Sequence, residues 1–256
     1  MTLGVVVRAA DVDADRTAAG ASVRKLIDTA SDDSGLVRRL VDLPSRSRFD
    51  GTAGAAGELW FVIDGAGQLD VAGEPGLPLS RDRGLWMPPG AAYQVRAGED
   101  GDLRLDIVSL PAVPSRSETS GGETSGSAVT GNQAPERGAL ASRDLADCEI
   151  ETTGDRQFRV VFGPGRGCAV ATQFVGEIPP GRAPDHSHPY DEVVLILQGE
   201  GIAHIGGAEH PLSAGTCAHL PPRLVHCLEN TGSAMMRVLG VFHPADSPAA
   251  KLEQQD

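Results

Sequence analysis

The feature that most constrains this sequence is a repeat, because two blocks of the second half reproduce blocks of the first half at a nearly constant distance. Pro88-Pro89 lies 133 residues before Pro221-Pro222. Glu58 lies 134 residues before Glu192, and each glutamate is followed by a glycine 7 residues later. Two separate blocks at nearly the same offset indicate a tandem duplication. We therefore expect two similar domains.

A stretch of different composition separates the two copies. From Pro111 to Gly138 the chain has no aromatic residue, no leucine, no isoleucine and no hydrophobic period, and Ser, Thr, Gly and Pro dominate. Such a segment buries too little apolar surface to offset its ordering entropy, so it is typical of a flexible linker. We expect domains at 1–110 and 139–256, joined by a linker over 111–138.

Each half consists of short apolar runs bounded by glycine and proline, such as Leu59–Ile63 and Val193–Leu197. The glycine pairs Gly65/Gly67 and Gly199/Gly201, which come shortly after two of these runs, are typical of hairpin turns. Helical periodicity is weak, and the one ambiguous segment, Ser22–Ala30, fits a helix or a strand equally well. Many short strands with regular turn signals predict an all-β sandwich or barrel.

The charge balance excludes several classes of partner. The chain has 22 basic and 35 acidic residues, which gives a formal net charge of −13. Nucleic acids and anionic membranes attract basic surfaces, so we expect neither as a partner. No apolar run approaches the roughly 18 residues of a membrane span, and no signal peptide is recognisable, so we expect a cytoplasmic protein. The four cysteines form no C-x-x-C pair and are expected to be reduced and buried.

One segment of the second half carries metal-binding chemistry. His186 and His188 are two residues apart, so both side chains point to one face of an extended chain. Glu192 has the same parity, and His226 follows a Pro-Pro turn that would begin another strand. Three imidazoles and one carboxylate on neighbouring strands form a mixed N/O site. Such a site suits one divalent transition metal per chain, either Fe, Mn, Ni, Co, Cu or Zn.

These residues lie within two segments that resemble the motifs of a known family. Gly181–Gly199 resembles the first cupin motif, and Gly215–Asn230 resembles the second. The resemblance implies a bicupin, that is, two tandem cupin barrels of the double-stranded β-helix or jelly-roll type. It departs from the family pattern at Arg223, which replaces a turn glycine, and in a slightly shorter loop before the histidines. Four residues stand at the positions of the family's metal ligands: His186, His188, Glu192 and His226.

The first half lacks the histidines of this pattern, since all seven histidines of the chain lie after the linker. Thr52, Gly54 and Tyr93 occupy the three histidine positions, and Glu58 alone is kept. One carboxylate cannot hold a transition metal by itself. We expect a metal-free packing and dimerisation domain, or a small pocket lined by Glu58, Trp60 and Tyr93. Glu58 and Trp60 have the same strand parity and are expected to face inward together.

Three further residues are weaker candidates for the site. Arg182 could clamp a substrate carboxylate or be a solvated loop residue. Gln173 could lie beside the ligands on the preceding strand. Tyr190 lies between two ligands with the opposite parity, so we expect it to pack outside the barrel. Arg182 and Gln173 are therefore the candidate catalytic residues.

A metal with these ligands keeps positions for a small-molecule substrate, and many cupins with this ligand set are dioxygenases. The resemblance therefore favours a metal-dependent, oxygen-dependent oxidoreductase. A redox-neutral Lewis-acid enzyme (an isomerase, decarboxylase or hydrolase) and a non-catalytic small-ligand binding module are the alternatives. Two barrels in one chain are expected to pair with each other, and assembly into a homo-oligomer is left open.

Overall fold

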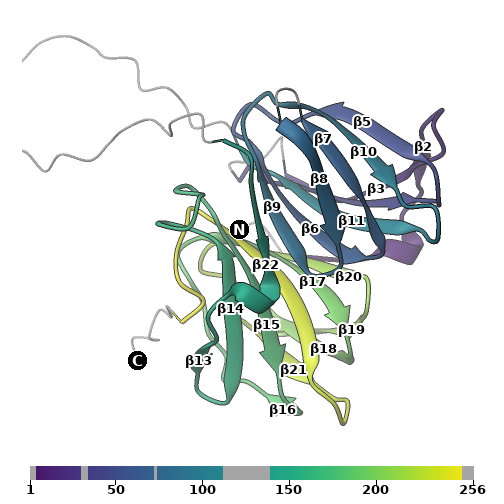
Figure 1. The fold of residues 1–256 in the computed structure, drawn as a ribbon. Helices are drawn as coiled ribbons and strands as arrows, with labels where there is room; N and C mark the ends of the chain where they lie inside the picture. The colour runs from purple at the N-terminus through teal and green to yellow at the C-terminus, as the bar shows by residue number, and fades with distance from the viewer. Residues whose placement is uncertain (1–3, 30–33, 72–73, 112–138, 250–256) are drawn as a thin grey trace, which may run out of the picture.

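The computed structural model describes residues 4–29, 34–71, 74–111 and 139–249. These residues form two β-barrels, one from each half of the chain (Figure 1), so the predicted all-β fold is confirmed. Apart from its first residue, the predicted linker over 111–138 lies outside the described residues. Within them, no helix is long and apolar enough to cross a membrane.

The N-terminal barrel is built from one seven-stranded and one four-stranded antiparallel sheet. The orders are β12-β9-β6-β11-β4-β3-β2 and β5-β10-β7-β8. The ambiguous segment after residue 21 is a strand, β3. The bounds are β2 (Asp15–Arg16), β3 (Ser22–Asp28), β4 (Val37–Leu43), β5 (Arg48–Thr52), β6 (Glu58–Asp64), β7 (Ala66–Val71), β8 (Glu74–Ser80), β9 (Arg83–Met87), β10 (Ala92–Ala97), β11 (Leu103–Ser109) and β12 (Ala141–Asp144).

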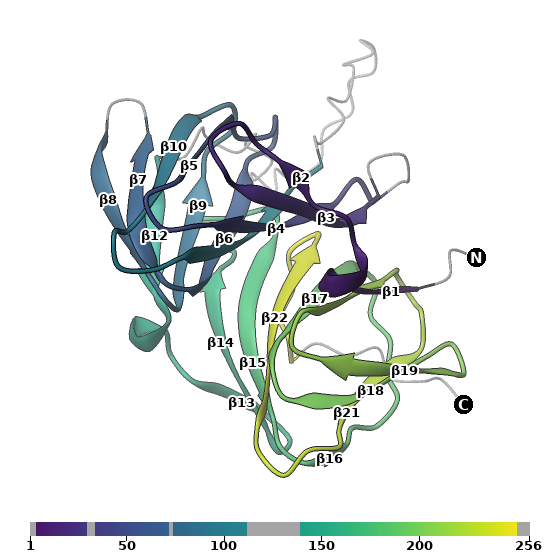
Figure 2. The ribbon, with the colours of Figure 1, turned by 90° about the vertical axis from the view of Figure 1, so that its right-hand side faces the viewer.

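The C-terminal barrel repeats this architecture with strands in the corresponding places (Figure 2). Its sheet orders are β1-β20-β17-β22-β15-β14-β13 and β16-β21-β18-β19. The bounds are β1 (Val5–Arg8), β13 (Glu151–Thr153), β14 (Arg156–Phe162), β15 (Thr172–Ile178), β16 (Gly181–Arg182), β17 (Asp191–Gln198), β18 (Glu200–Ile205), β19 (Ala208–Ser213), β20 (Thr216–Leu220), β21 (His226–Asn230) and β22 (Met236–His243).

The central strands are apolar on both faces because both faces are buried. In β17, Val193 and Leu195 join a core cluster that contains residues of both barrels. Val194 and Ile196, which point the other way, join a cluster inside the C-terminal barrel. A strand that is buried on both faces has a nearly continuous apolar sequence instead of an alternating one. The large sheets of the two barrels therefore pack against each other, and the smaller sheets lie outside.

The glycines that follow these strands do not make hairpins, contrary to expectation. Gly65 and Gly199 have φ values of 83° and 94°. The strands on either side of each glycine belong to different sheets, so the chain crosses from the large sheet to the small one there. A Cβ at Gly65 would lie 1.9 Å from the carbonyl oxygen of Asp102. The lack of a side chain therefore permits both the positive φ and this close approach.

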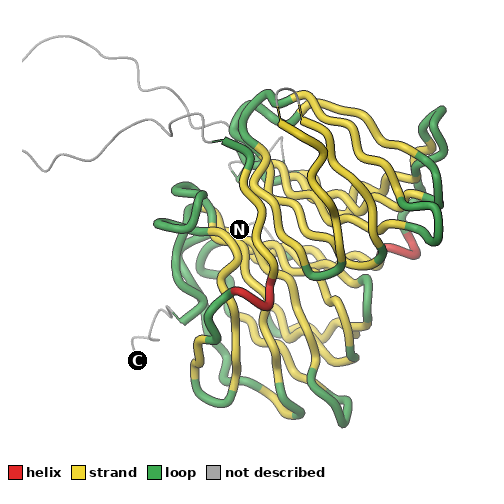
Figure 3. The backbone as a smooth tube through the Cα atoms, viewed as in Figure 1, coloured by secondary structure: helices red, strands yellow, loops and turns green. Residues whose placement is uncertain are grey.

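Each barrel receives an edge strand from the other half of the chain. β1 pairs with β20 of the C-terminal barrel, with Val5 opposite His219. β12 pairs with β9 of the N-terminal barrel, with Ala141 opposite Trp86. A short 3-10 helix follows each exchanged strand, η1 (Ala9–Asp11) or η2 (Leu145–Asp147), drawn red in Figure 3. Each barrel therefore includes a strand from beyond the predicted boundaries at 110 and 139.

A buried ion pair holds the two barrels together. Arg38 in β4 and Asp106 in β11 have fully buried side chains, and their atoms meet at 2.7 and 3.0 Å. The same guanidinium donates to the carbonyl oxygens of Val193 at 2.9 Å and Leu239 at 3.1 Å, which belong to the other barrel. The charge of Arg38 is thus neutralised within its own barrel, and its remaining donors are used across the interface.

Candidate metal centre

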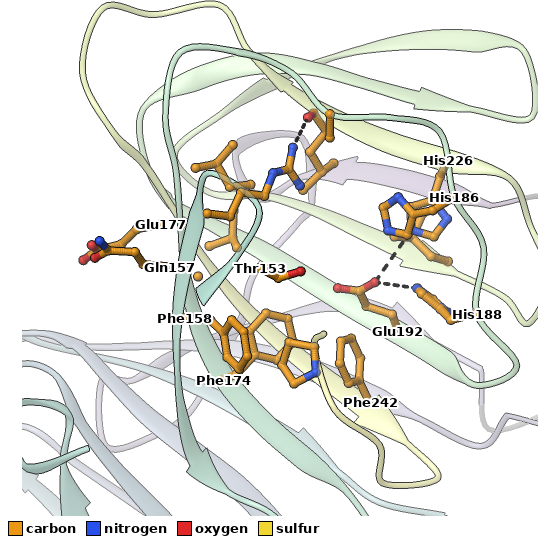
Figure 4. A pocket seen from close by; sticks show the side chains of 18 of the residues that line it. Thr153, Gln157, Phe158, Phe174, Glu177, His186, His188, Glu192, His226 and Phe242 are labelled. Atoms are coloured by element: carbon orange, nitrogen blue, oxygen red, sulfur yellow. Dashed lines mark hydrogen bonds and ion pairs between the residues drawn. The ribbon is translucent and has the colours of Figure 1, made fainter. Parts of the chain in front are cut away.

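The structure brings all four predicted ligands together at one end of the C-terminal barrel. His186 and His188 lie in the segment between β16 and β17, Glu192 is the second residue of β17, and His226 begins β21. Backbone hydrogen bonds in both directions between His186 and His226 hold the two segments side by side. Figure 4 shows the carboxylate of Glu192 directed toward His188 and toward the other two imidazoles.

The separations within this cluster fit a set of metal ligands. Nε2 of His188 lies 2.9 Å from Oε2 of Glu192, and Nε2 of His226 lies 3.9 Å from the same oxygen. Ligand nitrogens of the three histidines lie within 4.8 Å of one another. Bonds of about 2.0–2.2 Å to one metal place adjacent ligand atoms roughly 3–4 Å apart. The three imidazoles can therefore hold a metal ion, with Glu192 beside them.

Backbone carbonyls orient each imidazole. Nδ1 of His186 donates to the oxygen of Pro184 at 3.2 Å, and Nδ1 of His226 donates to that of Leu224 at 2.7 Å. Nδ1 of His188 donates to the carbonyl oxygen of Tyr190 at 3.1 Å. A carbonyl oxygen only accepts, so it assigns the proton to Nδ1 and leaves the lone pair of Nε2 for a metal.

The protonation states also suit a cation. Burial, together with the nearby His226, lowers the pKa of His186 to about 4, and burial lowers the pKa of His226 as well. Burial opposes ionisation of Glu192, but the hydrogen bond from His188 and the surrounding imidazoles hold its pKa below the usual value. For His188, the effect of burial is outweighed by the contact with Glu192, which raises its pKa. A raised pKa means that His188 holds an extra proton more readily, and a divalent ion bound to His188 would take the place of that proton.

A small cavity of about 100 Å³ adjoins the cluster. Aromatic rings form much of its wall, and they contact one another: the ring centroids of Phe174 and Phe242 are 4.7 Å apart, and those of Tyr190 and Phe242 are 4.5 Å apart. Figure 4 shows Phe158, Phe174 and Phe242 beside Glu192. These rings give the cavity an apolar wall beside the polar groups of the cluster.

Tyr190 lines this cavity, so the expectation that it packs outside the barrel is wrong. Its ring stacks on His188 with centroids 4.3 Å apart and an interplanar angle of 8°. The chain bends at Pro189 and Tyr190 and is not a regular strand there, so alternation cannot be counted across the two residues. Its hydroxyl donates to the carbonyl oxygen of Ser247 at 3.4 Å. Burial raises the pKa of this phenol, so the hydroxyl remains protonated.

The two candidate catalytic residues lie outside the cavity lining. Arg182 lies in the short strand β16, where its side chain is exposed to solvent and pairs with Asp185 at 3.0 Å. Gln173 does not lie beside the ligands, which corrects that expectation. It points from β15 into the interface between the barrels, where its amide donates to the carbonyl oxygen of Trp60 at 3.3 Å. Its neighbour Phe174 faces the cavity instead, because successive side chains of a strand point to opposite faces.

The corresponding place in the N-terminal barrel is filled by a hydrogen-bonded network. Glu58 is buried and accepts from Nε1 of Trp60 at 2.9 Å, from Arg39 at 2.6 Å and from the hydroxyl of Ser109 at 2.8 Å. Glu58 and Trp60 thus face inward together, as expected. Tyr93 packs edge-on against Trp60. In the described part of the chain, the histidine cluster is the one group of three His, Cys, Asp or Glu side chains placed to hold a metal.

Comparisons with known proteins agree with this architecture. Residues 174–242 match a family described as Cupin domain. The C-terminal barrel is therefore a cupin domain, and the whole chain has the fold of two tandem cupin barrels. The chain resembles the crystal structure of YlbA from E. coli, with a TM-score of 0.74 and 14% identity over 96% of this chain and 93% of that one. It also resembles Bacillus subtilis oxalate decarboxylase, with a TM-score of 0.72 and 14% identity over 99% and 79% of the two chains. No curated protein matches the sequence.

Proposed function

We propose that this cupin is a metal-dependent enzyme that acts on a small organic molecule, and that it is an oxygen-dependent oxidoreductase of the dioxygenase type. The convergence of three imidazoles and one carboxylate on a small aromatic cavity carries the proposal. Its centre is the C-terminal barrel, where His186, His188, Glu192 and His226 would hold one divalent transition metal.

The donor set fits such an ion. Neutral imidazoles and a carboxylate are borderline ligands that suit Fe, Mn, Ni, Co, Cu and Zn alike. A bound ion would supply Lewis acidity and, where it is redox-active, electron transfer. The chain itself supplies orientation and exclusion of water. The backbone carbonyls fix the imidazoles, Tyr190 stacks on His188, and Phe174 and Phe242 keep the substrate side apolar.

The acid–base inventory favours oxygen chemistry over proton transfer. Apart from Glu192, the described cavity lining has one carboxylate, that of Glu177, and it pairs with Arg159 at 3.7 Å. The phenol of Tyr190 donates to Ser247. The described lining therefore offers no carboxylate that is not already paired or placed among the ligands, whereas general acid–base catalysis needs a positioned group that can exchange a proton.

One observation favours a redox-neutral alternative. A structural neighbour over nearly the whole chain is an oxalate decarboxylase whose Mn(II) centres are described. A fold shared at 14% identity can host a different reaction, so the second candidate is a decarboxylase or related Lewis-acid enzyme. A binding module without turnover is the third.

Metal analysis and oxygen uptake separate these candidates. The purified chain is expected to hold close to one equivalent of metal, which His186→Ala abolishes. His210→Ala, a histidine of β19 outside the cavity lining, is the matched control and is expected to keep the metal. Oxygen uptake with small enolisable diketones or catechol by the Fe-, Mn-, Ni- or Cu-loaded chain supports the oxidoreductase. Anaerobic turnover of the same substrates or of small organic acids favours the Lewis-acid enzyme, and the absence of any turnover contradicts both.

A further inference from the structure

The cavity contains one basic side chain whose role the metal centre does not explain. Arg156, the first residue of β14, lines the same cavity as the histidine cluster. Of the described residues that line it, Arg156 is the one Lys or Arg. Its Nη2 atom donates to the carbonyl oxygen of Leu228 at 2.9 Å, which fixes the position of the guanidinium. A guanidinium has five N–H donors, so one such bond leaves capacity for a ligand.

Arg156 differs from its neighbours in its charge partners. Arg159 on the same strand pairs with Glu177, and Arg166 pairs with Glu151 at 3.5 Å. Among the described residues, no carboxylate lies within ion-pair distance of Arg156. The side chain is half-buried. Burial lowers its pKa, and the carboxylates of Asp155 and Glu192, neither of which is within ion-pair distance, oppose that effect. A half-buried cation without a carboxylate in contact is a ready-made partner for an anion.

We propose that Arg156 binds the carboxylate of a small organic acid while the rest of that molecule reaches the metal centre. This inference rests on the proposed function and names its substrate class. A divalent ion and Arg156 together exceed the negative charge of Glu192, so an anionic ligand balances the cavity. The cavity of about 100 Å³ leaves room for a small molecule. An engineered cavity of about 150 Å³ accommodates benzene, so an acid of the size of pyruvate fits.

Calorimetric titration of the metal-loaded chain tests the proposal. The probes are acetate, glyoxylate and pyruvate, and the neutral isostere pyruvamide controls for shape and for contacts that do not need the charge. Arg156→Gln is expected to weaken pyruvate binding about tenfold or more, because a charge-assisted hydrogen bond is lost, and to leave pyruvamide binding unchanged. Arg156→Lys keeps the charge, so its affinity for pyruvate is expected to lie between those of the wild type and Arg156→Gln. It replaces Arg156→Gln in the test if that variant does not fold.

Arg166→Gln is the matched control. Arg166 also donates to a backbone carbonyl, that of Val160 at 3.2 Å, and lies outside the cavity lining. Its replacement is expected to leave pyruvate binding unchanged. The inference is overturned if none of the three acids binds, if Arg156→Gln binds pyruvate within twofold of the wild type, or if the control loses as much affinity.

Metal content, measured on the same samples, distinguishes this inference from the proposed function. All variants are expected to hold the same metal equivalents as the wild type. A wild-type chain that binds no metal but still binds pyruvate through Arg156 contradicts the proposed function and not the carboxylate site. A metal-loaded chain that consumes oxygen with neutral substrates, and whose affinity for the acids is insensitive to Arg156, contradicts the carboxylate site alone.

Discussion

The two barrels keep a buried glutamate at the same place and surround it with different partners. In the C-terminal barrel, Glu192 faces three imidazoles that can hold a metal ion. In the N-terminal barrel, Glu58 meets the guanidinium of Arg39 at 2.6 Å. An ionised carboxylate is costly to bury without a compensating charge. The comparison shows that the N-terminal barrel does more than lack the metal-binding histidines. The guanidinium of Arg39 supplies a positive charge beside its buried glutamate.

The strand register shows where that cation enters. Ser109 and Phe242 are the ladder partners of the two glutamates. Each of these two residues also has a ladder partner on the next strand. Two positions after the partner of Ser109 the N-terminal barrel has Arg39, and two positions after the partner of Phe242 the C-terminal barrel has Phe174. One structural position therefore places a guanidinium on the carboxylate in one barrel and an aromatic ring on the cavity wall in the other.

The sharpest way to break this comparison is to replace a metal ligand in the C-terminal barrel and the buried glutamate in the N-terminal barrel. His188→Ala is expected to lower the metal affinity by at least about 100-fold, because even partners that only support a ligand contribute 10–100-fold. Glu58→Gln is expected to leave the metal content unchanged, since the charge near Glu58 comes from Arg39. Elemental analysis after dialysis measures both. Two metal equivalents in the wild type, or metal loss in Glu58→Gln, would show that the N-terminal barrel also binds metal.

A second comparison concerns the interface, where Arg38 makes the main polar contact from the N-terminal side. Arg38→Met is expected to lower the free energy of unfolding by about 3–5 kcal/mol, because it leaves Asp106 buried without a partner. The double variant Arg38→Met/Asp106→Leu is expected to recover most of that loss. Urea unfolding followed by circular dichroism measures both. A loss below about 1 kcal/mol in the single variant would contradict the assigned role.

Gln173 is the counterpart of Arg38 by strand register, and its effect is expected to be smaller. Its amide hydrogen bond is long, and its buried carbonyl oxygen has no hydrogen-bond partner. Gln173→Met is therefore expected to lower the free energy of unfolding by about 1 kcal/mol and to leave the metal content unchanged. The same urea and elemental measurements apply. Loss of metal would indicate that Gln173 supports the ligands after all and would contradict its assignment to the interface alone.

The smallest effect is expected from shortening the predicted linker. Deletion of Pro114–Gln133 is expected to change the free energy of unfolding by less than about 1 kcal/mol, since the entropy of loop closure varies slowly with length. Thermal unfolding and metal content of the deletion variant measure the outcome. A collapse of stability would show that the segment contributes to the paired barrels and is not a mere connection.

The all-β fold and the four ligand residues could be predicted from the sequence because the patterns that indicate them are local. The spacing of His186 and His188 and the recurrence of the motif with Glu192 are readable without a structure. Tyr190 was placed wrongly because the bend that begins at Pro189 interrupts the alternation on which the prediction depended. The turn at Gly65 was misread for a related reason, since a glycine with positive φ serves a hairpin or a crossing between sheets equally well.

Other features depend on contacts between residues that are far apart in the chain. Arg39 reaches Glu58 from another strand, and no spacing rule links the two. Arg156 enters the cavity from β14, well before the ligand motif. The pairing of β1 with β20 joins residues that are separated by most of the sequence. Such features follow from tertiary packing, which a local pattern does not encode.

The exchanged edge strands bear on how such a protein can evolve. A gene fragment cut within the segment between the halves would encode an N-terminal piece carrying β1 and a C-terminal piece carrying β12. In each piece, one edge strand of the large sheet would lack its pairing partner. Each piece would also expose a strand that normally pairs with the other barrel. Exposed edges of this kind recruit another chain. Recombination that separates the halves is therefore disfavoured, and the half without histidines is inherited together with the half that holds the histidine cluster.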